Sequence, residues 1–96
     1  MELEIIPFFL TFSIMFTVYI LYSKSIDRYY VGYTNDIQRR LSEHNRPKHK
    51  YTDAGIPWIL VYSEVFDSKK DAMLREKFIK AQKSKHFIAT LVDRSW

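Results

Sequence analysis

The chain has 96 residues, of which 47% are hydrophobic and 17% aromatic, a size and composition typical of one small globular domain. The absence of cysteine excludes a disulfide framework, a thiolate zinc site, an iron–sulfur cluster and a cysteine nucleophile. Fifteen Lys and Arg against eleven Asp and Glu give a formal net charge of +4. This excess is clustered in two segments, and clustering of this kind favours an anionic partner.

The N-terminal run of the chain, residues 5–23, carries no charged side chain and resembles a membrane span or signal anchor. Two glutamates precede it where such segments have basic flanks, and no small-residue cleavage site follows it. Its second half, residues 17–22, is rich in β-branched and aromatic residues, which favours a strand. We therefore predict an apolar N-terminal extension over residues 1–14 and a single domain over residues 15–96.

Met15 lies at the junction of these two segments, so an internal start at Met15 is an alternative to Met1. A membrane anchor through residues 5–22 is a further alternative. It predicts sedimentation with membranes and loss of that behaviour in a chain that starts at Met15. The favoured expectation is a cytoplasmic protein without a membrane partner, with which the absence of cysteine is compatible.

The first half of the domain contains two predicted strands and a helix. The strands are expected over residues 16–22 and 29–33, joined by a polar turn that predicts a hairpin. Residues 34–36 supply N-cap chemistry for a helix that ends near Asn45. Ile37 and Leu41 are spaced four apart, as expected for a helix with one apolar face toward a core.

The second half begins with a basic loop over residues 46–56, which contains Pro and Gly and shows no periodicity. Residues 58–66 predict the strongest strand, apolar enough at its start to be central in the sheet. A capping pattern at Ser68 predicts a helix to about Gln82, and a short helix follows from about Ser84. The order β-β-α-β-α-α predicts an α+β domain, with a small three-stranded antiparallel or mixed sheet flanked by helices.

Several short motifs along these elements occur in an order that resembles the GIY-YIG nuclease superfamily. The similarity covers about residues 16–82 and is closest to the small stand-alone bacterial members, which resemble the N-terminal nuclease domain of the excision-repair incision subunit. No single motif is diagnostic, but their order forms a joint signal. The motifs are Thr17-Val18-Tyr19, Tyr30-Val31-Gly32, Arg40-Leu41, His44-Asn45 and, in the second helix, Glu76.

This resemblance implies a metal-dependent DNA endonuclease, a hydrolase of phosphodiester bonds with a place in DNA repair. It implies a tyrosine as general base or proton relay, an arginine that stabilises charge on the phosphate, and a glutamate that holds one divalent cation, Mg²⁺ or Mn²⁺. The implied catalytic residues are Tyr19, Tyr30, Arg40, His44 and Glu76. Which tyrosine acts as the base is left open.

The two motif tyrosines are expected to share one face of the hairpin. If the turn is centred near residues 25 and 26, Tyr19 lies opposite Gly32 and Leu21 opposite Tyr30, and alternation places all four on one face. Gly32 would leave space for the Tyr19 ring and for a phosphate close to the backbone. A phenol has a reference pKa of about 10, so it needs a nearby cation to act as a base at neutral pH.

The first helix offers two further candidates. Arg40 projects toward the same side if the apolar stripe faces the sheet, and its planar guanidinium suits bidentate contact with a phosphate. A solvated helix arginine is the alternative, and it is favoured for Arg39. His44 lies one turn beyond Arg40 and could position water, polarise a tyrosine or contact phosphate, although exposed histidines at helix ends are common.

Glu76 is the candidate metal ligand. On a helical wheel it lies near Ala72 and Ile79, a largely apolar face on which a carboxylate needs a partner. One carboxylate with substrate phosphate and water suits Mg²⁺. A salt bridge to Lys80, four residues on, is the alternative.

The sequence departs from the family pattern at two positions. Thr17 replaces the glycine of the first triplet, which a strand accommodates easily, and the asparagine that often follows the metal glutamate has no counterpart after Asn45. The alternative function is therefore a catalytically inactive nucleic-acid-binding module of the same fold. A membrane-tethered interaction protein is a third alternative.

The basic residues form two groups that could flank one cleft and attract a phosphate backbone without sequence readout. DNA is the expected partner, bound without sequence specificity or by its structure, and a protein partner could supply further specificity. The residues expected to bind nucleic acid are Gly32, Arg39, Arg46, Lys48, Lys50, Lys80 and Lys83.

Overall fold

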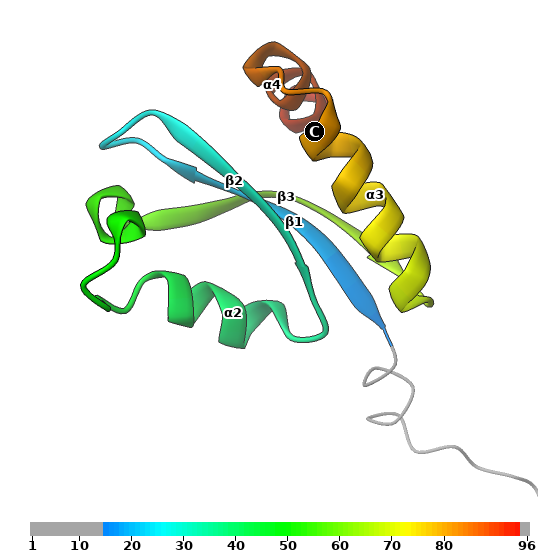
Figure 1. Ribbon diagram of the computed structural model, residues 1–96, viewed down its shortest axis with the longest axis horizontal. Coiled ribbons are helices and arrows are strands. Elements are labelled where there is room, and N and C mark those ends of the chain that lie inside the picture. Colours follow the sequence, from blue (N-terminus) through cyan, green and yellow to red (C-terminus); the bar gives the residue numbers. More distant parts are fainter. Residues whose placement is uncertain (1–14, 95–96) are drawn as a thin grey trace, which may run out of the picture.

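The structure, a computed structural model, describes residues 15–94. The elements follow one another in the predicted order β-β-α-β-α-α, with a short 3-10 helix before the third strand (Figure 1). The predicted extension, residues 1–14, lies outside the described residues. The elements are β1 (Phe16–Ser23), β2 (Arg28–Thr34), α2 (Ile37–His44), η1 (Tyr51–Gly55), β3 (Trp58–Phe66), α3 (Lys69–Ala81) and α4 (Lys85–Asp93).

The three strands form one sheet in the order β2-β1-β3, and both pairs are antiparallel. The register of the hairpin is the predicted one, with Tyr19 opposite Gly32 and Leu21 opposite Tyr30. The expectation that β3 is central is wrong, because β1 lies between the other two strands. Tyr19, like the other three residues of the run 18–21, is at most 1% exposed, so β1 is covered on both faces.

β3 is an edge strand in spite of its apolar sequence. Ile59, Leu60 and Val65 are exposed on it, whereas a central strand would have both faces and both edges covered. Apolar content therefore identified β3 as a strand without revealing its neighbours. One of its ends is nevertheless well packed, since Trp58 is buried against β1.

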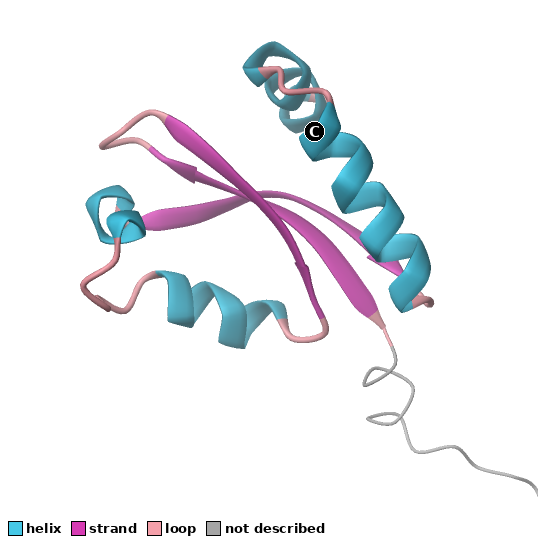
Figure 2. Cartoon of the chain, viewed as in Figure 1, coloured by secondary structure: helices cyan, strands magenta, loops and turns pink. Residues whose placement is uncertain are grey.

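The sheet separates two layers of helices, with α2 on one face and α3 and α4 on the other (Figure 2). Alternation along β1 creates one hydrophobic cluster on each face. Tyr19 and Leu21 pack with Trp58 and the apolar stripe of α2. Val18 and Ile20 pack instead with buried side chains of α3 and with half-buried side chains of α4. The core is therefore two thin clusters on either side of one strand.

Each α-helix within residues 15–94 begins at a side chain that caps it. Asp36 accepts a hydrogen bond from the backbone N–H of Arg39 at 3.0 Å, and Ser68 and Ser84 cap α3 and α4 in the same way. Such caps satisfy backbone donors that the first turn leaves unpaired. Phe78 of α3 contacts Phe87 of α4 at 6.0 Å between ring centroids, as expected for facing helices. Within residues 15–94, no helix combines the length and the apolar character that crossing a bilayer requires.

Candidate active site

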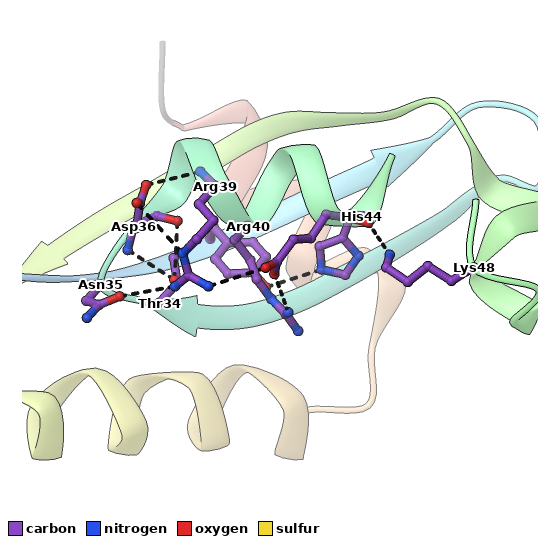
Figure 3. A network of polar contacts seen from close by, with 9 residues as sticks. Thr34, Asn35, Asp36, Arg39, Arg40, His44 and Lys48 are labelled. Atoms are coloured by element: carbon purple, nitrogen blue, oxygen red, sulfur yellow. Dashed lines mark hydrogen bonds and ion pairs between the residues drawn. The ribbon is translucent and has the colours of Figure 1, made fainter. Parts of the chain in front are cut away.

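The packing of α2 determines where its polar side chains point. Ile37 and Leu41, spaced one turn apart, pack against the cluster around Tyr19. This anchors the helix to the sheet and carries Arg40 and His44 along the side of α2 that faces the hairpin (Figure 3). The sequence-based expectation that the apolar stripe would direct Arg40 toward the tyrosines is confirmed by its contact with Tyr19.

Tyr19 connects these two side chains. The Arg40 Nε–H donates to the Tyr19 hydroxyl over 3.3 Å, and the same hydroxyl lies 3.4 Å from His44 Nε2. The tyrosine ring crosses Gly32 so closely that a Cβ added there would lie 2.5 Å from the hydroxyl oxygen. Gly32 therefore allows Tyr19 to reach Arg40 and His44 across the neighbouring strand.

Tyr30 approaches the same histidine from β2. Its ring centroid lies 4.4 Å from that of His44, in an edge-on arrangement that is favourable for ring pairs. Unlike Tyr19, Tyr30 lines an open pocket of about 230 Å³. Three of the five predicted catalytic residues meet in this pocket, together with lysines and two residues of η1. The lining residues include Tyr30, Arg40, His44, Lys48, Lys50 and Tyr51.

The protonation states follow from burial and charge. Burial raises the pKa of Tyr19, and the hydrogen bond from Arg40 only partly offsets this, so Tyr19 is a neutral phenol at neutral pH. Burial lowers the pKa of His44, and the positive charges of Arg40 and Lys48 lower it further. His44 is therefore a neutral imidazole at neutral pH. With the Arg40 Nε–H already donated to Tyr19, the Tyr19 proton can go to His44 Nε2.

Glu43 is a residue of this network that sequence reasoning missed. Its carboxylate lies 3.0 Å from Arg40 Nη1, and the hydrogen bonds to Tyr19 and Glu43 raise the pKa of Arg40. Arg39 forms two ion pairs on the exposed surface of α2, one with Glu43 and one with Asp36 (Figure 3). Spacing alone allowed Glu43 to pair with either arginine, so its position gave no signal.

Glu76 lies on α3, across the sheet from α2. Its side chain is 16% exposed, and its carboxylate forms an ion pair with Lys80 at 3.2 Å, the alternative that spacing suggested. Its carboxylate forms no direct hydrogen bond or ion pair with the tyrosines, Arg40 or His44, yet its negative charge contributes to the raised pKa of Tyr19. Glu76 therefore influences the site through its charge and not through direct contact.

The donor set around Glu76 fits a cation that brings most of its own ligands. No group of three or more His, Cys, Asp or Glu side chains suited to a metal occurs within residues 15–94. A single carboxylate is the donor set of a Mg²⁺ that retains water and uses substrate phosphate.

Four of the seven predicted nucleic-acid-binding residues line two pockets, whereas Gly32 is buried beneath the Tyr19 ring. Lys48 and Lys50 line the pocket with Arg40, whereas Lys80 and Lys83 line a second pocket of about 430 Å³ between β2, α3 and α4. Tyr30 and Tyr51 line both pockets, so the two lie side by side. Arg39 and Arg46 are exposed and line neither pocket.

Tyr51 is a second residue that sequence reasoning missed. It is 88% exposed at the junction of these pockets, in a segment predicted only as a loop. Its place at the start of a single 3-10 turn depends on how the loop folds. No periodicity marks such a turn, so the sequence offered no signal for it.

Comparison with known proteins places the chain in a family. The profile of the GIY-YIG catalytic domain matches residues 15–88. Relatives of the chain include three UPF0213 proteins. That of Streptococcus pneumoniae serotype 4 is 42% identical over 70% of this chain and 72% of its own length. That of Streptococcus agalactiae serotype V is 47% identical over 68% and 74%. That of Halobacterium salinarum is 53% identical over 54% and 69%.

A solved structure supports the same assignment. The solution NMR structure of the UPF0213 protein BH0048 from Bacillus halodurans is 35% identical in sequence. It covers 82% of this chain and 83% of its own length, with a TM-score of 0.53. The sequence match over most of the domain and the shared fold lead to one conclusion: the chain belongs to the GIY-YIG family, among the UPF0213 proteins.

Proposed function

We propose that this protein is a metal-dependent endonuclease that hydrolyses phosphodiester bonds in DNA. The observation that carries the proposal is the pocket in which Tyr30, Arg40 and His44 converge beside two lysines. A guanidinium can stabilise charge on a phosphate, and a phenol and a neutral imidazole around the same open volume can move the proton of an attacking water. Membership of the GIY-YIG family supports the same reaction class.

Each side chain has a role that its position supports. Arg40 binds the non-bridging oxygens of the phosphate and stabilises the charge that develops there. Tyr30, open to the pocket and packed against the neutral ring of His44, relays the proton: its hydroxyl takes up the proton of the attacking water as its own hydroxyl proton passes to solvent in the pocket. Tyr19 is 1% exposed and acts by positioning Arg40 and His44. The choice of Tyr30 over Tyr19 as the proton acceptor rests on this difference in access.

Glu76 is the residue that would hold Mg²⁺ or Mn²⁺, which when bound supplies Lewis-acid polarisation of a phosphate oxygen. Lys80 neutralises the Glu76 carboxylate at 3.2 Å and, on release from it, is free to contact a phosphate. Lys80 also lines the second pocket next to Tyr30. The two basic groups therefore provide one track for a polynucleotide backbone, which would be bound with salt-sensitive affinity and little sequence preference.

The test compares cleavage of labelled linear and branched DNA by the wild type, Tyr30→Phe and Glu76→Gln, with Mg²⁺ and with chelator. Tyr33→Phe is a matched control, because Tyr33 packs on the opposite face of β2. Asp71→Asn makes the same charge change as Glu76→Gln in the first turn of α3. We expect Mg²⁺-dependent cleavage that falls about 100-fold or more in the two site variants and is kept in the controls.

One further outcome separates the two candidate functions. A wild type that binds DNA but cleaves it under no metal condition, with site variants that bind equally well, would refute the nuclease proposal. It would favour the binding module instead. The observation behind that second function is the Lys80–Glu76 ion pair, which already satisfies the carboxylate without a metal.

A further inference from the structure

Of the loop predicted over residues 46–56, residues 46–50 connect α2 to η1 and form the basic loop. Its Lys48 and Lys50 line the pocket that also contains Arg40 and His44. Lysines on a loosely held loop lose conformational freedom when they bind, and that loss lowers affinity. What holds this loop therefore decides how much its charges contribute.

One carboxylate, that of Asp53 in η1, closes the basic loop. The backbone N–H of Lys48 donates to both of its oxygens, at 3.1 and 2.9 Å, and the N–H of His49 donates at 2.7 Å. In the reverse direction, the Asp53 N–H donates to the carbonyl of Lys50 at 2.9 Å. Partial burial alone would raise the pKa of Asp53, but backbone hydrogen bonds from Lys48, His49 and Lys50 lower it. The carboxylate is thus charged at neutral pH and the hydrogen bonds are charge-assisted.

The backbone of the loop is in a conformation that needs such support. His49 has φ of 61°, in the left-handed region that a residue with a Cβ rarely adopts. It lies between the two lysines that line the pocket, so its conformation sets the directions in which they leave the backbone. The hydrogen bond from the His49 N–H to Asp53 holds this residue in place.

Further contacts fix the basic loop and η1 to the rest of the fold. Lys48 Nζ donates to the carbonyl of Glu43 in the last turn of α2. On the other side, the Trp58 indole N–H donates to the carbonyl of Thr52 at 3.0 Å. The Ser25 hydroxyl donates to the carbonyl of Ala54 at 3.1 Å. The Asp53 carboxylate joins these anchored parts, because it fixes the backbone of Lys48 and His49 to η1.

We infer that Asp53 is a positioning residue that holds the basic loop so that Lys48 and Lys50 face the phosphates of a bound polynucleotide. The inference rests on the proposed function and deepens it. Asp53 itself touches no phosphate, and as an anion beside the pocket it opposes binding by simple Coulombic repulsion. Its contribution through loop geometry therefore has the opposite sign to its contribution through charge.

This opposition of signs makes the inference testable. Removing a negative charge close to a DNA-binding surface normally strengthens binding. In Asp53→Asn an amide N–H₂ replaces one acceptor oxygen and confronts backbone donors, so the loop loosens and binding weakens. The matched control is Asp27→Asn, which makes the same charge change in the hairpin turn, where Asp27 pairs with Lys85 outside the pocket.

The experiment titrates labelled DNA without metal over a range of KCl concentrations. For Asp53→Asn we expect a Kd about tenfold higher and a salt dependence reduced by about one to two phosphate contacts. Asp27→Asn should bind as tightly as the wild type or more tightly. A second variant, Asp53→Glu, keeps the charge but moves the carboxylate by one methylene, and it should also weaken binding. Urea denaturation of each variant verifies that it is folded.

A double-mutant cycle distinguishes positioning from general destabilisation. Replacing both lysines by alanine should cost the wild type much affinity and Asp53→Asn little, because the lysines are already misplaced there. Asp53→Asn binding as tightly as Asp27→Asn, with an unchanged salt slope, would overturn the inference and leave the proposed function intact. Failure of the wild type to bind DNA at all would overturn both.

Discussion

Gly32→Ala provides a direct test of the arrangement around Tyr19. A Cβ at position 32 would lie 2.5 Å from the Tyr19 hydroxyl oxygen and 2.7 Å from Cζ. Ordinary non-bonded contact requires about 3.5 Å, so the end of the ring must move by about 1 Å. Tyr19 is buried on the central strand, and it cannot move far without displacing its neighbours.

The consequences divide between stability and activity. Overpacking of this kind costs about 1–3 kcal/mol, offset by less than about 1 kcal/mol because Gly is itself unfavourable in a strand. The contacts of Tyr19 with Arg40 and His44 are already 3.3 and 3.4 Å long, so a shift of 1 Å breaks at least one. Misplacement on that scale can lower kcat about 100-fold.

The assay combines urea denaturation with DNA cleavage at saturating substrate. The double variant Gly32→Ala/Tyr19→Phe lacks the hydroxyl oxygen that lies closest to the added Cβ. It should therefore recover part of the lost stability but none of the activity. If Gly32→Ala unfolds at the wild-type urea concentration and cleaves at the wild-type rate, Tyr19 does not hold Arg40 and His44 in the way described.

Two further predictions concern stability. Asn45 accepts from the Trp58 N–H at 2.6 Å and donates to the Trp58 carbonyl at 2.9 Å. Asn45→Ala should therefore lower the free energy of unfolding by about 1–3 kcal/mol in urea titrations, and a loss near zero would show that water replaces the amide. Because the folded protein lowers the pKa of His44, the unfolded chain binds its proton first. Wild-type stability should thus begin to fall as pH drops below about 6.5. His44→Gln should remove that part of the pH dependence, and equal slopes for both proteins would contradict the assignment.

Much of the fold could be predicted because local patterns determine it. Residues 16–22 and 29–33 are strands within one residue at each end, and the polar turn between them fixes a register that the structure confirms. The capping pattern at Ser68 marked the start of α3, and the apolar residues after Ser84 marked α4. Each of these signals depends on residues close together in the chain.

The order of strands could not be predicted in the same way. Both β1 and β3 are apolar, and which of them has two neighbours depends on packing between distant segments. Within the site, the strand register and the apolar stripe of the helix predicted that Arg40 lies on the same side as Tyr19, and the structure shows the two in contact. Asp53 gave no such signal, because its partners are backbone N–H groups that every residue carries.

The pairing of β1 with both neighbours has a consequence for the kinetics of folding. The β1–β2 hairpin closes through a short turn and can form early. Pairing of β1 with β3 joins Ser23 to Trp58, so it must close a long loop that contains α2 and the basic loop, at an entropic cost that slows it. The Trp58 backbone N–H also donates a hydrogen bond to Asn45 at the end of α2. We therefore expect the pairing of β3 with β1 to be the late, rate-limiting step of folding, which fixes α2 in place and completes the pocket.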